Sequence, residues 1–145
     1  MEILQNVHSY LAYVVIIVLI LAVFNAVTGL VGNRMFTLQK DFRISLFALI
    51  LSHLQLILGL LLFFFSTSGL KALQAVGMSG LNAPARLLAV EHPFINILAI
   101  LLITFGWTRH KKFLEGKKKF KSIALFYGLG LLLILSRIPW GQWLN

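Results

Sequence analysis

The chain has 145 residues, of which 59% are hydrophobic and 12% charged, and 13 Lys and Arg against 4 Asp and Glu give it a formal net charge of +9. The apolar residues form long uninterrupted blocks, which is typical of membrane-crossing helices and excludes an ordinary soluble domain. The absence of cysteine excludes disulfides, thiolate-bound iron–sulfur clusters and covalent haem attachment through Cys-x-x-Cys-His. The positive charge falls between the apolar blocks, so we attribute it to the orientation of the chain in a membrane and expect no nucleic-acid partner.

The first two predicted spans cover residues 8–31 and 44–65. No basic segment precedes the first block, so we expect it to be a retained span and not a cleaved signal peptide. The connection between the spans, residues 34–43, carries a net charge of +2. The second span has no formal charge, but it contains His53 and Gln55, and lipid offers such polar side chains no hydrogen-bond partner.

The third predicted span has its apolar part at residues 86–107. The long connection before it includes a short segment, residues 70–76, that we expect to form a helix on the membrane surface. Asn82 followed by Pro84 is typical of a helix start, so the third helix is expected to begin ahead of its apolar part. Pro93 then lies inside this helix and kinks it, or alternatively begins a new helix.

The segment of residues 109–121 contains seven Lys and Arg against Glu115, a net charge of +6, and the fourth predicted span covers residues 122–138. Basic connections stay on the cytoplasmic side of a membrane. The sequence therefore predicts an all-α integral membrane protein of the bacterial inner (cytoplasmic) membrane. It is expected to form an antiparallel four-transmembrane-helix bundle, a single membrane domain over residues 1–145, with both termini outside.

Three of the four histidines lie at different depths in the predicted bundle. At ~1.5 Å per residue above the inner helix ends, His53 lies at ~15 Å, His92 at ~25 Å and His8 at ~35 Å. His110 lies among basic residues at the inner surface, where we expect a solvated side chain. Asn96 is four residues after His92, so the two share a helix face, and Asn96 lies near the depth of His53.

Ionisable residues inside a membrane span are functional-site candidates by default. Two neutral imidazoles from different helices can ligate one haem iron, and arginines near an interface can pair with haem propionates. His53 pairs with His92 if Pro93 shifts the third span, whereas His8 pairs with His92 if that span is straight. No catalytic residues are assigned. The candidate residues are His53, His92 and His8 as iron or metal ligands, with Asn96, Arg86 and Arg137 completing a haem-binding set.

Several short segments spread over most of the chain resemble one family. They are His8-Ser9, Ser52-His53-Leu54-Gln55-Leu56-Ile57-Leu58-Gly59, Glu91-His92-Pro93, Leu102-Ile103-Thr104-Phe105-Gly106 and Ile138-Pro139-Trp140. On these segments the chain resembles small four-span membrane proteins of Bacteroidetes-type bacteria catalogued as "cytochrome B", and more distantly cytochrome b561-like four-helix bundles. The chain departs from the family at Trp107, where a histidine is expected, which bears on a second, inner haem ligand.

The resemblance implies b-type haem, one or two per chain, and electron transfer with a quinone or a redox partner protein. Two other functions stay open. The chain is a non-catalytic accessory subunit of a larger membrane complex if His53 serves only as an interhelical hydrogen bond to Asn96 or Gln55. It is a proton or metal transporter if His92, Asn96 and His53 act as successive steps. The lipid bilayer is a partner in every case, and a homo-oligomer is compatible with each.

Overall fold

The computed structural model describes residues 1–143 and is 85% helical, with no strand in this part of the chain. The all-α class is therefore confirmed. Four helices are long and apolar enough to cross a membrane: Glu2–Val31, Leu38–Phe65, Ala83–His110 and Gly116–Ser136. The elements in order are α1 (Glu2–Val31), η1 (Leu38–Phe42), α2 (Arg43–Phe65), α3 (Leu70–Gly80), α4 (Ala83–Arg86), η2 (Leu87–Glu91), α5 (His92–His110), α6 (Gly116–Ser136) and α7 (Trp140–Trp143).

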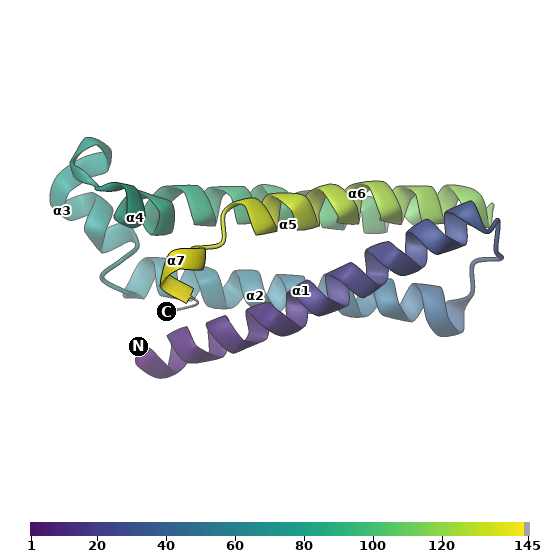
Figure 1. The fold of residues 1–145 in the computed structure, drawn as a ribbon, viewed down its shortest axis with the longest axis horizontal. Helices are drawn as coiled ribbons and strands as arrows, with labels where there is room; N and C mark the ends of the chain where they lie inside the picture. The colour runs from purple at the N-terminus through teal and green to yellow at the C-terminus, as the bar shows by residue number, and fades with distance from the viewer. Residues whose placement is uncertain (144–145) are drawn as a thin grey trace.

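The long helices lie side by side, and α1 and α5 each contact both α2 and α6 (Figure 1). The N-terminus, α3 and α7 lie at one end of the molecule, and the α1–α2 and α5–α6 connections lie at the other. Both strongly basic segments, residues 34–43 and 109–121, therefore belong to the same end. We call this the basic end, and the end with the N-terminus the opposite end.

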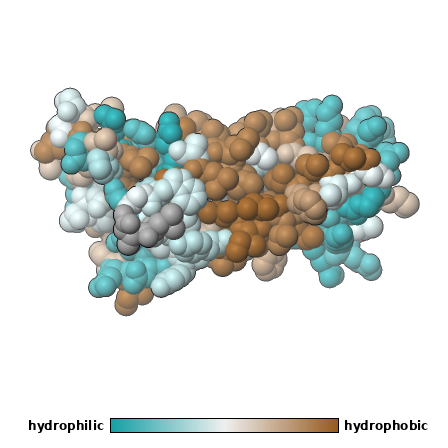
Figure 2. All heavy atoms as spheres, viewed as in Figure 1, coloured by the Kyte–Doolittle hydropathy of each residue, from teal (hydrophilic) through white to brown (hydrophobic). Residues whose placement is uncertain are grey.

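The surface carries a broad apolar belt between two hydrophilic ends (Figure 2). Large apolar side chains are exposed on every long helix, among them Phe24 at 66%, Phe47 at 62%, Leu101 at 59% and Leu132 at 64%. A protein surrounded by water rarely exposes so much contiguous apolar surface. The belt matches the apolar environment that a bilayer provides.

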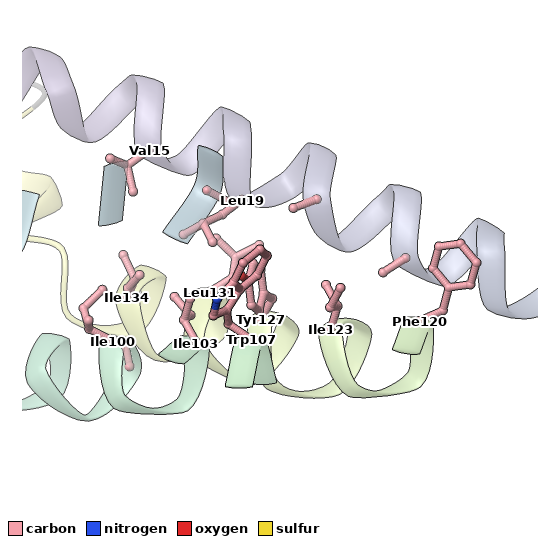
Figure 3. Packing of buried hydrophobic residues seen from close by; sticks show 14 of the residues in the cluster. Val15, Leu19, Ile100, Ile103, Trp107, Phe120, Ile123, Tyr127, Leu131 and Ile134 are labelled. Carbon is pink, nitrogen blue, oxygen red and sulfur yellow. The ribbon is translucent and has the colours of Figure 1, made fainter. Parts of the chain in front are cut away.

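The buried core lies where α1, α5 and α6 meet (Figure 3). Leu19, Ile103 and Tyr127 are fully buried there. Close packing of α5 on α6 depends on Gly130, since a Cβ at that position would lie 2.7 Å from Cγ1 of Ile103. The Tyr127 hydroxyl donates to the backbone oxygen of Ser45 at 2.9 Å, which joins α6 to α2.

The third long helix runs from Ala83 through His110. The Asn82 side chain accepts a hydrogen bond from the backbone N–H of Ala85 at 3.0 Å, so the predicted helix start is confirmed. The turn immediately before Pro93, Leu87–Glu91, is π-helical. A wider turn accommodates the proline ring and its missing N–H, so Pro93 lies inside a continuous helix and does not begin a new one.

A buried carboxylate organises the connection between α1 and α2. Asp41 is 0% exposed. It accepts hydrogen bonds from Nδ2 of Asn25 at 2.8 Å, from the backbone N–H of Thr37 at 2.8 Å and from its hydroxyl at 2.9 Å. Nη2 of Arg34 lies 3.4 Å from the same carboxylate. In the sequence, Asp41 is only one of the charged residues of this connection. In the structure, its hydrogen bonds hold the α1–α2 connection in place.

Candidate functional site

A cavity of about 240 Å³ lies between α1, α2, α5 and the C-terminal part of α6 and extends to α7. Its polar lining includes His8 from α1, Ser52 and Gln55 from α2, and His92 and Asn96 from α5. Further polar lining residues are Gln5, Ser9, Ser66, Ser68 and Gln142. The lining among the described residues contains no Asp, Glu, Lys or Arg. The cavity is thus an apolar chamber with a few polar side chains, which is the usual character of a small-molecule site.

His8 and His92 meet in this cavity. Their ring centroids are 6.3 Å apart and the ring planes are at 78° to each other. Gly59 of α2 makes room for the His8 ring, because a Cβ at position 59 would lie 3.1 Å from Cε1 of His8. Gln55 holds the same residue from α2, since its Nε2 donates to the His8 backbone oxygen at 2.8 Å and lies 3.4 Å from Nε2 of the ring.

The His92 ring is oriented by the backbone at the end of α6. Nδ1 of His92 lies 2.7 Å from the backbone oxygen of Arg137. A carbonyl oxygen only accepts, so Nδ1–H is the donor and Nε2 keeps its lone pair. Metal-binding histidines are commonly oriented in this way, with the second ring nitrogen donating to a carbonyl. Asn96, by contrast, donates to the His92 backbone oxygen at 2.6 Å, within its own helix.

Arg86 and Arg137 lie next to His92 and share one carboxylate. Glu91 accepts from Nε of Arg86 at 3.1 Å and pairs with Nε of Arg137 at 3.4 Å. The three side chains are between 34% and 48% exposed. The sequence analysis expected these arginines near the histidine pair. The structure places them there, but both already have an acidic partner.

His53 does not approach His92. Its Nδ1 lies 2.8 Å from the backbone oxygen of Leu49, and its Nε2 lies 3.2 Å from Oγ1 of Thr104 on α5. His53 is not among the cavity-lining residues. His53 thus makes an interhelical hydrogen-bond contact between α2 and α5. Its partner is Thr104, whereas Asn96 or Gln55 was expected.

Within residues 1–143, three buried polar atoms of cavity-lining residues have no hydrogen-bond partner: Nδ1 of His8, Oγ of Ser52 and Oε1 of Gln55. Buried polar atoms in folded proteins are nearly always paired, with protein, water or a ligand. Ser52 was not a predicted site residue. Its position relative to Gln55 and Gly59, at spacings of three and seven residues, puts all three on one helix face, and that spacing is the signal in the sequence.

The expectation of a solvated His110 is wrong. Its side chain is 1% exposed, and its Nδ1 lies 2.5 Å from the backbone oxygen of Trp107. The rings of Phe36, Phe42 and Trp107 lie 5.6, 6.2 and 4.6 Å from its ring. Aromatic side chains thus shield His110 from the solvent, although its basic neighbours in the sequence predict an exposed side chain.

Within residues 1–143 no group of three or more His, Cys, Asp or Glu is placed to hold a metal ion. The His8–His92 pair is therefore the best candidate for a cofactor, and it could supply two ligands. Comparison of the chain with protein-family models, with curated proteins and with solved structures finds no match. The functional conclusion thus rests on the chemistry of the site and on the resemblance of the sequence segments.

Proposed function

We propose that the chain is a multi-pass protein of the bacterial inner membrane, in which the four long helices form an antiparallel bundle. The apolar belt of Figure 2 and the length of the four helices support the membrane assignment. Residues 34–43 and 109–121 carry net charges of +2 and +6, and both belong to the basic end. The positive-inside rule then orients that end toward the cytoplasm and both termini outward.

We further propose that the cavity binds one b-type haem between His8 and His92, and that the protein transfers electrons. The observation that carries the proposal is the 6.3 Å separation of the two imidazole rings. At that separation, one imidazole from α1 and one from α5 could hold the same iron. The free Nε2 lone pair of His92 supplies the donor that iron requires.

The donor set fits a haem, whereas the present volume of the cavity does not. A volume of about 240 Å³ is below the roughly 300–1,000 Å³ usual for small-molecule sites, so the apolar walls around the histidine pair would have to move outward to admit a porphyrin while His8 and His92 keep their spacing. Arg86 and Arg137 lie near His92 but outside the cavity lining, and both pair with Glu91, so they would have to leave that carboxylate to bind propionates. His53 already has partners in the helices, so we propose a single haem.

The chain's own residues contribute orientation and exclusion of water. The Arg137 carbonyl fixes the His92 tautomer, Gln55 and Gly59 place His8, and apolar side chains form the rest of the walls. A haem bound there would supply one-electron chemistry. As its exchange partner we propose a quinone of the same membrane or a redox protein at its outer face.

Haem titration of purified variants tests the assignment. His92→Ala and His8→Ala should each abolish stoichiometric haem binding, because each removes one of two ligands. His53→Gln is the matched control and should retain it, since His53 lies outside the cavity. Loss of haem in His53→Gln, with His8→Ala unaffected, would contradict the assignment of the ligand pair.

A further inference from the structure

We propose that the inner part of the cavity binds a neutral, largely apolar molecule with a hydroxyl group, of the phenol class, and that Ser52 and Gln55 hold the hydroxyl. This inference deepens the proposed function, on which it rests only for the ligand's role in electron exchange. Binding itself requires no haem and is argued from the cavity lining.

The unpaired atoms define what the ligand must offer. Nε2 of Gln55 donates to the His8 backbone oxygen, which fixes the amide so that Oε1, an acceptor, remains unpaired. The Ser52 hydroxyl is 0% exposed and also unpaired. A ligand hydroxyl complements both, because it donates to the Gln55 oxygen and accepts from the Ser52 O–H.

His8 adds a third polar atom in the haem-free protein. Its Nε2 lies 3.4 Å from the Gln55 amide nitrogen, which can only donate, so Nε2 is the acceptor. The proton of the neutral ring then lies on Nδ1, which has no partner and lines the same cavity. This N–H is a second donor for the oxygen of a bound hydroxyl.

The rest of the lining determines the body of the ligand. No acidic or basic side chain among the described residues lines the cavity, so a charged ligand would be buried without a counter-charge at high cost. Apolar side chains from all four long helices surround Ser52 and Gln55. They include Val15, Ile16, Leu56, Ile100 and Ile134. The volume of about 240 Å³ suits one substituted ring.

Ordered water is the alternative occupant. A single water needs only about 10–15 Å³ and two to four polar partners. The cavity is far larger, at about 240 Å³, and most of its lining is apolar, so water alone satisfies the three polar atoms without filling the chamber. A molecule with one polar end and an apolar ring matches both parts of the lining.

The test compares two probes of nearly equal shape, 4-propylphenol and its methyl ether 4-propylanisole, by titration calorimetry on the haem-free full chain in detergent. The phenol should bind roughly tenfold more tightly, since the ether cannot donate to Gln55. Ser52→Ala should lower the affinity for the phenol several-fold, because it removes the hydroxyl that donates to the ligand oxygen. Ser136→Ala is the matched control and should leave this affinity unchanged, because the Ser136 hydroxyl bonds to Leu133 of its own helix and is exposed.

Equal affinity for the two probes, or an unchanged affinity for the phenol in Ser52→Ala, would overturn the inference. Binding of neither probe would show a cavity that takes water only and would overturn it as well. The wild-type comparison needs no variant, so misfolding of Ser52→Ala leaves the test decisive. If the chain binds the phenol but no haem, the proposed function is wrong and the inferred ligand class still holds. If it binds haem but not the phenol, only the inferred ligand class is wrong.

Discussion

The imidazole rings of His8 and His92 lie 6.3 Å apart in one cavity, although the two residues belong to the first and third long helices. Gly59 leaves space for one ring and the Arg137 carbonyl orients the other. Two imidazole rings from separate helices therefore lie close together in one cavity.

Gly59→Ala should weaken haem binding. The added Cβ would lie 3.1 Å from Cε1 of His8, so the ring must shift from its place opposite His92. Overpacking costs about 1–3 kcal/mol, roughly 5- to 150-fold in affinity, measured by haem titration. Gly128→Ala is the control, because a Cβ there meets only Val23 at 3.9 Å. Equal affinity in both variants would show that Gly59 does not position His8.

Ser52→Ala should raise the stability of the ligand-free protein. Its buried hydroxyl has no partner, and an unsatisfied buried polar group costs about 1–3 kcal/mol. Ser45→Ala, on the same helix, should lower stability by about 1 kcal/mol, since its hydroxyl donates to the backbone oxygen of Asp41 at 2.8 Å. Unfolding midpoints in detergent distinguish the two. A similar loss in both would indicate that Ser52 is a structural residue.

Asp41→Ala should be strongly destabilising. The carboxylate is 0% exposed, and its loss leaves Asn25, Thr37 and Arg34 without their acceptor. Each buried donor left unsatisfied costs about 1–3 kcal/mol, whereas Arg34, which is 35% exposed, adds little. Glu91→Ala removes a carboxylate that is 34% exposed, and exposed pairs contribute only about 0–1 kcal/mol. Comparable unfolding curves for the two variants would disprove the structural role of Asp41.

Single-cysteine labelling tests the orientation, because the natural chain contains no cysteine. Leu114→Cys introduces a thiol at a side chain that is 99% exposed at the basic end, and Met78→Cys does so at a 62% exposed position in α3. In intact spheroplasts a membrane-impermeant maleimide should label position 78 alone, and position 114 only after lysis. The opposite pattern would invert the proposed topology.

The helices could be predicted from the sequence because their signals are local. Apolar blocks of spanning length, and a helix start at Asn82 and Pro84, depend on neighbouring residues only. The candidate site could be predicted only in part. Depth along the helices placed His8 near His92, and the structure brings these two together.

The rotation of a uniformly apolar helix cannot be predicted in the same way. Every face of residues 44–65 is rich in Leu, Ile and Phe, so the sequence does not say which polar residue points into the bundle. Each residue turns the helix by about 100°. Ser52 and Gln55 therefore line the cavity while His53 meets Thr104. Likewise, the aromatic cover of His110 depends on Phe36 and Phe42, which are distant in sequence.

The most direct measurement is the reduced-minus-oxidised absorption spectrum of the wild-type protein, purified after expression with haem supplied in excess. A coloured preparation with the bands of a low-spin b-type haem, at one haem per chain, is the expected result, since His8 and His92 would together hold the iron. A folded, colourless protein that shows no such bands after haem addition would contradict the haem assignment.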